Sequence, residues 1–561
     1  MNRDLDRLST MQFDVLVIGG GIYGAFAAWD AAARGLSVAL VEKSDFMSGT
    51  SSNSLKVLHG GLRYLPDLRP DRVHRMVRER TAMMRLAPHL VRPLPFVLPS
   101  HGRGMRSRAV LGLGLRLNDA LAMDRNRDLP PELHLPPGRL LSPSEFRAAF
   151  PDYESPVPIS GAALWYDAQI VDTERFGISV LKSAYAEGAC LANYVEATGI
   201  RSEGQRVTGA TVHDAFTDES FQVRSQLVII ACGPWTVELL DKLRIGTGER
   251  PIDPSLAMNA VIDRTTPGMA LGITLDGPLR NRRGRGSGAD LIFLVPWKTG
   301  AIIGTIHEPY RRGWSPPVTS DPPLERLLEA VNHRLPAMAL KVSDVRLVHR
   351  GLLPSHPRPA DDRRVDLVRE GYVIDHGALG YHGLLSIVGV KFTSARHLAE
   401  RAIDLALEEH PRPARDCQTR SRAIVGGGFG SLPSYIEDQE RRLGRSLPRP
   451  LLEDLVRSYG TDYKEVLAEL PNSSNGKRET ALTSADVMMA KVRYAVVSEM
   501  AHSLEDVVRR RIGVGAGGCP SPSDLAMCAH EMAMLLGWDS RQVDREIHRA
   551  VEAFREPIPA A

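Results

Sequence analysis

The sequence of 561 residues predicts an α/β protein with a parallel sheet at the start of the chain, an antiparallel sheet in its middle and a helical C-terminal part. Three observations lead to this prediction. Residues 14–43 read as strand, glycine-rich turn, helix and strand. Residues 251–375 contain short apolar runs separated by Gly and Pro, which is typical of antiparallel strands. Beyond the Pro- and Arg-rich stretch 410–420 the patterns are helical, with one helix start at Ser503-Leu504-Glu505-Asp506.

The first element is a βαβ unit built around a glycine motif. An apolar strand over 15–18 leads into Gly19-x-Gly21-x-x-Gly24, a helix rich in small residues follows, and a second strand ends at Glu42, 18 residues beyond the last glycine. A glycine motif between a strand and a helix, followed by an acid at this distance, is the dinucleotide-binding fingerprint of Rossmann-like domains. A βαβ unit that binds no nucleotide is the alternative.

Each residue of the fingerprint has an expected role. Gly19 allows the tight turn, Gly21 lets the backbone approach a pyrophosphate, and Gly24 lets the helix pack on the strand. The N-terminus of the helix offers free N–H groups to the phosphates. Glu42 is expected to accept a hydrogen bond from a ribose hydroxyl.

The next elements alternate between helices and strands. A helix is expected over 71–86, where apolar residues recur at helical spacing, and another begins at Ser142-Pro143-Ser144-Glu145, a capping box with proline at the first helical position. Residues 172–190 form a further helix, and strand-rich sequence follows. The strand over 227–231 ends in Cys232-Gly233-Pro234-Trp235, where folds of this kind bring another glycine turn beneath bound phosphates.

The second half of the chain is interpreted as an antiparallel sheet, a return to the first domain and a helical end. Strands of the sheet are expected from residue 252 onward and over 258–263, 291–295, 301–306, 345–350 and 371–375. The chain then returns to the first domain with a strand over 384–388, a turn at Gly389 and a helix over 393–408. We therefore expect two interleaved domains over 1–410 and a helical domain over 411–561.

Composition restricts the class of protein. The formal net charge of +3 gives no drive toward nucleic acid, and the five cysteines have no CxxC or other cluster spacing, which argues against a metal site, an iron–sulfur cluster and a disulfide framework. No run of about 18 apolar residues is present, and the polar N-terminal segment has no apolar signal core. We expect a cytoplasmic protein without metal or nucleic acid.

Several segments resemble the FAD-dependent glycerol-3-phosphate dehydrogenases, a branch of the glycine/D-amino-acid oxidase-like flavoproteins. Two segments are specific to this branch, HGGLRYL (59–65) and APHLVRPLPFVLP (87–99), whereas ACGPW (231–235) is shared by the wider group. Further matches are FLVPW (293–297), AIIGT (301–305), LLSIVGVKFTSARHLAE (384–400) and YAVVSEMAHSLEDVVRRRIGVG (494–515). The resemblance covers nearly the whole chain.

The resemblance implies that the Rossmann-like domain binds FAD. Because no histidine or cysteine lies in a recognisable attachment motif, we expect the FAD to be bound non-covalently. Beside the fingerprint, the residues that the resemblance implies at the cofactor are Thr50, Ser51, Ser52, His59, Gly60, Gly61, Val195, Gly233, Gly389, Lys391 and Thr393. A helix that begins near Thr393 would point its positive dipole end at the flavin and stabilise the anionic reduced form. A surface lysine at a helix start is the alternative for Lys391, but a cation there opposes the helix dipole.

The implied substrate is a small phosphorylated polyol, most simply sn-glycerol 3-phosphate, which would be oxidised to dihydroxyacetone phosphate. Arg63, Tyr64, Arg369 and Lys391 match the positions that bind the substrate phosphate in the family. An arginine suits a phosphate because its guanidinium donates two parallel hydrogen bonds. Arg63 and Lys391 are also expected to act in catalysis.

The sequence departs from the family pattern where the reacting hydroxyl carbon is expected. Asn259 stands in place of a histidine, Leu353 in place of an arginine, and Ile306-His307 in place of Thr-Asp; Val390 replaces a glycine. Asparagine cannot act as a general base at ordinary pH. The resemblance therefore implies that the phosphate end of the site is retained and the reacting end is altered.

His307 is our candidate to replace the lost catalytic group, and Asn259 remains a candidate substrate contact. His349 and Arg350 are alternatives to His307. Two other classes of function stay open. One is a flavin enzyme for a longer polyol phosphate or an amine, and the other is a catalytically weak flavoprotein that binds a partner or a lipid.

Segment 94–117 predicts a membrane-facing surface. Four arginines surround its apolar run 109–115: Arg103, Arg106, Arg108 and Arg116. A proline-broken apolar stretch, 94–98, precedes them. Basic and apolar residues without spanning length fit an interfacial segment, and a buried helix with a charged rim is the alternative. Since quinone-linked relatives bind the bilayer, the resemblance favours a peripheral protein on the inner face of the cytoplasmic membrane with quinone as acceptor; a homodimer is also compatible.

Overall fold

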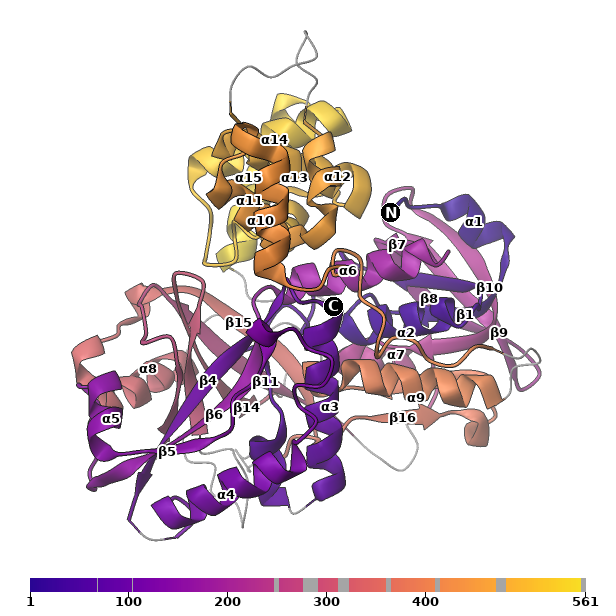
Figure 1. Cartoon of the computed structure of the whole chain (residues 1–561). Coiled ribbons are helices and arrows are strands. Elements are labelled where there is room, and N and C mark those ends of the chain that lie inside the picture. The colour runs from indigo at the N-terminus through magenta and orange to yellow at the C-terminus, as the bar shows by residue number, and fades with distance from the viewer. Residues whose placement is uncertain are drawn as a thin grey trace.

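The computed structural model describes residues 1–67, 69–102, 104–246, 252–275, 291–310, 322–359, 365–408, 414–470 and 481–555. Arg103 and the expected domain boundary near residue 410 lie outside these ranges. Figure 1 shows a lobe around parallel strands, a lobe around antiparallel strands, and a bundle of C-terminal helices in orange and yellow. The predicted α/β class with a helical C-terminal part is confirmed, while the division at residue 410 stays a prediction.

An eight-stranded sheet forms the first domain. Its strands are β1 (Gln12–Ile18), β2 (Val38–Glu42), β7 (Cys190–Asn193), β8 (Val195–Glu203), β9 (Arg206–Asp214), β10 (Glu219–Ile230), β16 (Tyr372–Asp375) and β17 (Leu384–Val388). Strands β17, β10, β1, β2 and β7 lie side by side and parallel, and β8 and β9 extend β10 as antiparallel strands. The predicted βαβ unit therefore lies at the centre of a Rossmann-like sheet.

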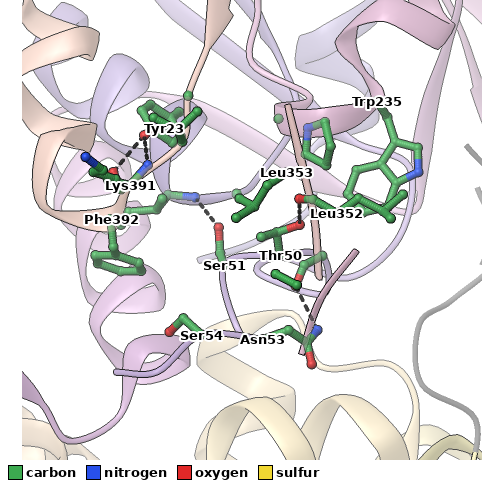
Figure 2. A pocket seen from close by; sticks show the side chains of 18 of the residues that line it. Tyr23, Thr50, Ser51, Asn53, Ser54, Trp235, Leu352, Leu353, Lys391 and Phe392 are labelled. Atoms are coloured by element: carbon green, nitrogen blue, oxygen red, sulfur yellow. Dashed lines mark hydrogen bonds between the residues drawn. The ribbon is translucent and has the colours of Figure 1, made fainter. Parts of the chain in front are cut away.

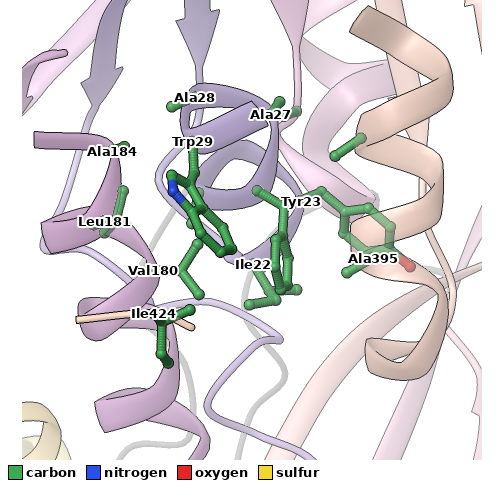
Figure 3. Packing of buried hydrophobic residues seen from close by; sticks show 14 of the residues in the cluster. Ile22, Tyr23, Ala27, Ala28, Trp29, Val180, Leu181, Ala184, Ala395 and Ile424 are labelled. Carbon is green, nitrogen blue, oxygen red and sulfur yellow. The ribbon is translucent and has the colours of Figure 1, made fainter. Parts of the chain in front are cut away.

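Three helices cover one face of this sheet: α2 (Ile22–Ala33), α6 (Thr173–Ala186) and α9 (Ala395–Glu408). Every residue of α2 is buried, because it packs against the other two helices and the strands below. Figure 3 shows Trp29 of α2 against Val180 of α6, with Tyr23 pointing toward α9. The opposite face packs against α1 (Leu5–Thr10), α7 (Thr236–Lys242) and the strands β8 and β9.

The second sheet has nine strands, which come from a wider part of the chain than expected. They are β3 (Val57–Leu58), β4 (Val91–His101), β5 (Arg139–Leu141), β6 (Ile159–Ile170), β11 (Asp253–Ile262), β12 (Ala270–Thr274), β13 (Leu291–Trp297), β14 (Gly300–Pro309) and β15 (Val345–Ser355). The expected strand over 371–375 is not among them. It is β16 and pairs with β17, because the two strands are close in sequence and form an antiparallel pair at the edge of the first sheet.

Residues 94–98 belong to β4, which corrects their expected place at a membrane surface. β4 pairs with β6 on one side and β12 on the other, and Leu94, Phe96 and Val97 are buried. A buried strand and an interfacial segment both read as a short apolar run, so the pattern alone did not separate them. None of the helices within the described ranges is long and apolar enough to cross a membrane.

Four further helices flank the two sheets: α3 (Pro70–Leu86), α4 (Arg108–Leu121), α5 (Pro143–Ala149) and α8 (Pro322–Arg334). α3 and the capping box at Ser142 match the predictions. The C-terminal part contains α10 (Leu432–Leu443), α11 (Arg449–Tyr459), α12 (Tyr463–Ala468), α13 (Ser484–Glu499), α14 (Pro522–Leu536) and α15 (Ser540–Arg555). The helix start expected at Ser503 leads into a short π-helix, η12 (Asp506–Arg511).

Candidate active site

A cavity of about 490 Å³ is lined by residues of both sheets. Its walls come from the turn after β1, the segment 43–57, the turn after β10, strands β11 and β14, and the turn after β17. Figure 2 shows Lys391 and Phe392 on one side of the view and Trp235 on the other, with Ser51 and Leu353 between them. The carboxyl ends of parallel strands are the usual ligand site of such sheets, so the fingerprint and the expected substrate residues open into one space.

The fingerprint glycines form a turn that side chains would obstruct. Gly19 has a φ of 110°, and a Cβ there would lie 2.8 Å from the carbonyl oxygen of Ala231. A Cβ on Gly24 would lie 1.9 Å from the carbonyl oxygen of Gly19, so α2 packs close to β1. A Cβ on Gly21 would instead meet the Oγ of Ser51 at 3.2 Å, with nothing else of the described chain within 4 Å. Gly21 therefore leaves room for a ligand.

Glu42 holds this turn from the end of β2. Its Oε2 accepts a hydrogen bond from the N–H of Gly20 at 2.7 Å, and its Oε1 accepts one from the N–H of Ser44 at 2.9 Å. Burial raises the pKa of the Glu42 carboxyl, and the two N–H donors oppose that rise. Glu42 also lines the cavity, and each of its oxygens can accept a second hydrogen bond. This is the arrangement that a ribose hydroxyl requires.

The segment 49–54 forms a wall of hydroxyl groups beside the start of α2. The Oγ of Ser51 accepts a hydrogen bond from the N–H of Ile22 at 3.0 Å. The Oγ1 of Thr50 donates to the carbonyl of Leu352 at 2.9 Å, which ties the first domain to β15 (Figure 2). The glycine turn, the acid and the hydroxyl wall at a helix N-terminus together fit the ribose and pyrophosphate of a dinucleotide.

Tyr23 links α2 to the turn after β17. Its hydroxyl donates to the carbonyl of Lys391 at 2.7 Å and accepts from the N–H of Lys391 at 3.0 Å (Figure 2). A Cβ on Gly389 would lie 2.1 Å from the Tyr23 ring. The expected helix start near Thr393 is a 3₁₀ turn, η9 (Phe392–Ser394), which continues into α9. Tyr23 thus positions the backbone that faces the cavity, a role that the sequence pattern did not predict.

Cationic side chains gather at one side of the cavity. Arg63 and Tyr64 belong to η1 (Gly61–Asp67), and Arg72 belongs to α3. The Nζ of Lys391 lies 4.5 Å from the centre of the Tyr64 ring, and the guanidinium of Arg72 lies 5.0 Å from it. The carbonyl oxygen of Arg369 accepts hydrogen bonds from Lys391 at 3.1 Å and from Arg72. Such a group of cations suits a phosphate.

His59 and Asp167 form a hydrogen-bonded pair at the cavity wall. The Nδ1 of His59 lies 3.2 Å from Oδ2 of Asp167, a buried residue of β6. Asp167 also accepts from the N–H of Gly60 at 2.7 Å and from Arg80 at 2.5 Å. Burial and the charge of Arg63 lower the pKa of His59, although Asp167 opposes them. A neutral imidazole that donates from Nδ1 to a carboxylate presents Nε2 as a base.

Asn259, His307 and Leu353 also line the cavity. The Oδ1 of Asn259 accepts a hydrogen bond from the hydroxyl of Thr305 at 2.7 Å, so the amide NH₂ is its remaining donor. Burial, and then the charge of Arg63, lowers the pKa of His307 to about 4, which leaves its ring neutral at pH 7. The alternatives to His307, His349 and Arg350, are not among the described residues that line the cavity.

Most of the predicted site residues line this cavity: Gly19, Gly21, Glu42, Thr50, Ser51, His59, Arg63, Tyr64, Val195, Gly233, Asn259, His307, Arg369, Gly389, Lys391 and Thr393. Four predicted residues do not: Gly24, Ser52, Gly60 and Gly61. The hydroxyl of Ser52 donates to the carbonyl of Gly49 at 3.0 Å. Cβ atoms on Gly60 and Gly61 would lie 2.2 Å from the Arg80 guanidinium and 2.1 Å from the Asn118 amide oxygen, so these glycines admit side chains of α3 and α4.

Several cavity residues were not predicted: Tyr23, Asn53, Ser54, Lys56, Arg72, Trp235 and Thr305. All of them lie within or beside segments that the pattern had singled out. Lys56 is buried, and its Nζ bonds to Oε2 of Glu174 at 2.8 Å, which anchors the segment 50–56 to the start of α6. A buried lysine in a loop carries no periodic signal, because its partner is set by the tertiary fold.

Two family models match the chain. The model described as "FAD dependent oxidoreductase" matches residues 14–391, and the model described as "C-terminal domain of alpha-glycerophosphate oxidase" matches residues 417–543. The first match covers more than half of the chain. Together with a cavity whose glycine turn, acid and hydroxyl wall fit a dinucleotide, it places the protein among the FAD-dependent oxidoreductases.

Similar proteins narrow this class. A glycerol-3-phosphate dehydrogenase of Synechocystis sp. is 30% identical over 564 residues, covering 99% of this chain and 98% of that protein. One of Mycobacterium leprae is 33% identical over 557 residues, covering 97% and 88%. The chain belongs to the glycerol-3-phosphate dehydrogenase family. The structure of the glycerol-3-phosphate dehydrogenase from Bacillus halodurans, complexed with FAD, has the same fold, with a TM-score of 0.74 at 23% identity over 100% of this chain and 99% of that one.

Proposed function

We propose that this protein oxidises sn-glycerol 3-phosphate to dihydroxyacetone phosphate with FAD. The observation that carries the proposal is one cavity that combines a dinucleotide turn, a group of cations and a histidine paired with a buried carboxylate. The names of the relatives from Synechocystis and Mycobacterium leprae support the choice of substrate. Gly21, Glu42 and Ser51 would hold the ribose and pyrophosphate of FAD, and the turn 389–393 would hold its ring.

The residues of the chain bind the phosphate and remove the hydroxyl proton. Arg63, Arg72 and Lys391 bind the phosphate through charge-assisted hydrogen bonds. Nε2 of His59 takes the proton from the hydroxyl at C2, and the carboxylate of Asp167 stabilises the imidazolium that forms. The chemistry that FAD would supply when bound is that of a hydride acceptor for the same carbon. The C2 carbon loses one hydride and its oxygen loses one proton, so the product is the ketone.

Anaerobic reduction of the flavin tests this proposal. Addition of sn-glycerol 3-phosphate is expected to bleach the yellow holoenzyme, whereas glycerol, which lacks the phosphate, is expected to leave it yellow at the same concentration. Equal bleaching by glycerol would contradict the role of the cation group. A flavin that dithionite bleaches but sn-glycerol 3-phosphate does not would contradict the substrate.

A second substrate class, a longer polyol phosphate, has one specific observation in its favour. Leu353 and Asn259 line the cavity where the family pattern has an arginine and a histidine. An apolar side chain and a neutral amide leave room and hydrogen-bonding capacity for a larger carbon chain. Faster bleaching by a four- or five-carbon polyol phosphate than by sn-glycerol 3-phosphate would favour this class.

The membrane surface is restricted to α4 in this proposal. Leu113 and Leu117 are 68% and 49% exposed, Arg116 is exposed beside them, and Met123 beyond the helix is 86% exposed. Arg108 does not contribute to the surface as expected, because its guanidinium donates to the carbonyl of Leu141 at 2.6 Å. An exposed apolar stripe with a cation fits an interfacial helix, and membrane quinone is the corresponding electron acceptor. A homodimer stays a prediction.

Vesicle binding tests this surface. The double substitution Leu113→Asp and Leu117→Asp is expected to abolish binding to vesicles that contain anionic lipid, while oxidation with a soluble dye acceptor continues. Met534→Asp is the control, because Met534 is 67% exposed on α14 of the C-terminal part. Equal vesicle binding by the double variant would contradict a membrane role for α4.

A further inference from the structure

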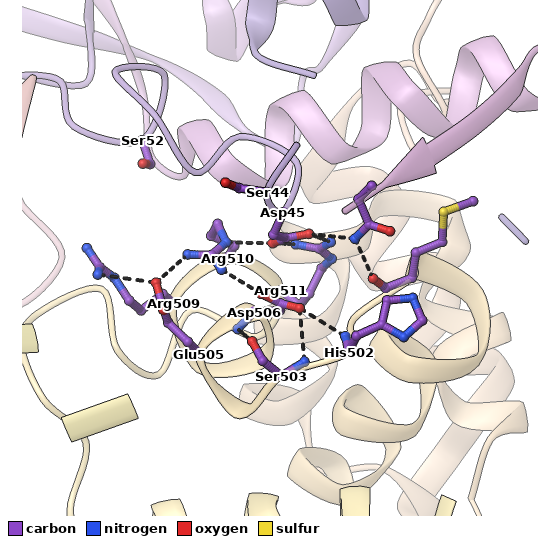
Figure 4. Close-up of polar contacts among 12 residues, drawn as sticks. Ser44, Asp45, Ser52, His502, Ser503, Glu505, Asp506, Arg509, Arg510 and Arg511 are labelled. Atoms are coloured by element: carbon purple, nitrogen blue, oxygen red, sulfur yellow. Dashed lines mark hydrogen bonds and ion pairs between the residues drawn. The ribbon is translucent and has the colours of Figure 1, made fainter. Parts of the chain in front are cut away.

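A buried group of charges lies where the C-terminal helices meet the first domain (Figure 4). The carboxylate of Asp45 accepts hydrogen bonds from Nε of Arg510 at 2.5 Å and from Nη1 and Nη2 of Arg511 at 2.9 and 2.7 Å. Asn193 adds a fourth at 3.1 Å. Asp45 is 1% exposed and Arg511 is 2% exposed. Burial alone would raise the pKa of the Asp45 carboxyl, but the charges of Arg511 and Arg510 outweigh it and hold that pKa below its usual range.

Further contacts hold both arginines, and Arg511 donates to the carbonyl of Glu499, the last residue of α13, at 3.2 and 3.1 Å. Arg510 also donates to Asp506 at 2.6 Å and to Glu505 at 2.8 Å. Asp506 accepts further bonds from the hydroxyl of Tyr194 at 2.8 Å and from the N–H of Ser503 at 3.0 Å. The short π-helix η12 therefore presents its guanidinium groups to the first domain in one arrangement. Such an arrangement suits recognition of one particular carboxylate.

Asp45 lies at the start of the loop that lines the dinucleotide end of the cavity. The preceding residue, Ser44, donates its N–H to Glu42 at 2.9 Å and accepts at its carbonyl from the N–H of Tyr194 at 3.0 Å. Two residues further on, the N–H of Met47 donates to the carbonyl of Gly20 at 3.1 Å. The loop 43–54 is thus bonded to the fingerprint turn on one side and to η12 on the other.

We propose that the C-terminal domain holds the loop 43–54 in its FAD-binding conformation through the contact of Asp45 with Arg510 and Arg511, and so retains the cofactor. These three are positioning residues, since none of them lines the cavity. A buried charge whose partner is removed is left uncompensated, which costs far more than the loss of an exposed ion pair. Whichever of these charges is left without its partner draws water into the contact, so the loop would move away from η12 and would take Ser51 and the Glu42 turn with it. The proposal goes beyond the proposed substrate and does not depend on it.

The test compares Asp45→Asn with a matched control, Glu499→Gln. Glu499 joins the same two parts of the chain through Arg175, with bonds of 2.8 and 2.5 Å, and is equally buried. Among the described contacts its side chain has none with loop 43–54. Three quantities are measured on the full chain: Tm of the apoprotein, Kd for FAD by titration of the apoprotein, and amide hydrogen exchange of residues 43–54 without FAD.

Both variants are expected to lower Tm. Only Asp45→Asn is expected to raise Kd for FAD, by about tenfold or more, and to speed exchange in 43–54. A Kd within about twofold of the parent for Asp45→Asn, or an equal rise for Glu499→Gln, would overturn the proposal. Arg511→Lys covers the case in which Asp45→Asn does not fold, because it keeps the charge but not the two parallel bonds. Parent values of Kd and exchange in Arg511→Lys would also overturn it.

Discussion

The two ends of the cavity are built by different means. At the dinucleotide end the contacts come from backbone and short side chains of one stretch of sequence, such as Gly19, Glu42 and Ser51. At the reacting end His59 follows β3, at one edge of the second sheet, Asn259 lies in β11, next to the opposite edge strand, and Lys391 comes from the first domain. A change in a strand of the second sheet leaves the glycine turn, Glu42 and Ser51 of the dinucleotide end in place. The reacting end could therefore change its chemistry while the cofactor stays bound, which is the divergence that the resemblance to the family implies.

The largest expected effects lie at the dinucleotide end. Gly24→Val would push a side chain into the carbonyl of Gly19, where a Cβ would already lie at 1.9 Å, and is expected to abolish folding. Gly21→Val has room for its Cβ at 3.2 Å from Ser51 and would instead project into the cavity. We expect folded, colourless protein, checked by circular dichroism and the ratio of flavin to protein. Stoichiometric flavin in Gly21→Val would contradict the assignment of Gly21 to the pyrophosphate site.

The next largest effect is expected on kcat when His59, the proposed general base, is replaced. His59→Gln is expected to lower kcat by about 10²- to 10⁴-fold, the usual contribution of general base catalysis. His307→Gln is the matched control, because the Nδ1 of His307 has no hydrogen-bond partner among the described residues that could orient the ring. The larger loss is expected at His59. A larger loss of kcat in His307→Gln would instead identify His307, the candidate predicted from the sequence, as the general base.

The pH profile sharpens this assignment. An imidazolium cannot accept the hydroxyl proton, so activity is present above the pKa of the base and is lost as pH falls through it. Because burial and Arg63 lower the pKa of His59, the acid limb of kcat/KM is expected below about pH 6.5, the ordinary histidine value. Asp167→Asn removes a contribution that raises this pKa and is expected to move the limb further toward acid. An acid limb above the ordinary value would contradict His59 as the base.

The phosphate contact is expected to have a smaller effect. Arg63→Ala should weaken binding of a phosphorylated substrate by about 1.5–3 kcal/mol, the usual worth of a hydrogen bond to a charged group. Arg116→Ala on the exposed face of α4 is the control and should leave KM unchanged. Unchanged KM and kcat in Arg63→Ala would remove this residue from the site.

The smallest effect is expected at Tyr23, whose hydroxyl connects the helix of the dinucleotide end to the backbone of Lys391 at the reacting end. Tyr23→Phe removes the two hydrogen bonds to the backbone of Lys391, each worth about 1 kcal/mol. Tyr463→Phe is the control, since its buried hydroxyl donates to Gln439 at 2.8 Å in the C-terminal helices. Both variants are expected to lower Tm, but only Tyr23→Phe should shift the reduction potential of the flavin. An unchanged reduction potential of the flavin would show that Tyr23 has a structural role only.

The difference between the ends also explains what the sequence could predict. The fingerprint turn was predictable because a glycine turn, a helix start and the following acid are all set within thirty residues or so of chain. The pair of His59 and Asp167 was not, because its members are 108 residues apart and meet only when β6 pairs with β3. Likewise the apolar character of residues 94–98 was predicted correctly, but their place at a membrane surface was wrong. Pairing of β4 with β6 and β12 buries these residues in the second sheet.

The contact between Tyr23 and Gly389 makes two distant positions of the chain interdependent. The Tyr23 ring occupies the space that any side chain at position 389 would need, at 2.1 Å from an added Cβ. A larger residue at 389 becomes admissible only after position 23 has become small, and that first step gives up the anchor of the Lys391 backbone. The order of steps is therefore constrained in any lineage, natural or engineered, that seeks to reshape the flavin turn: residue 23 has to change before residue 389 can.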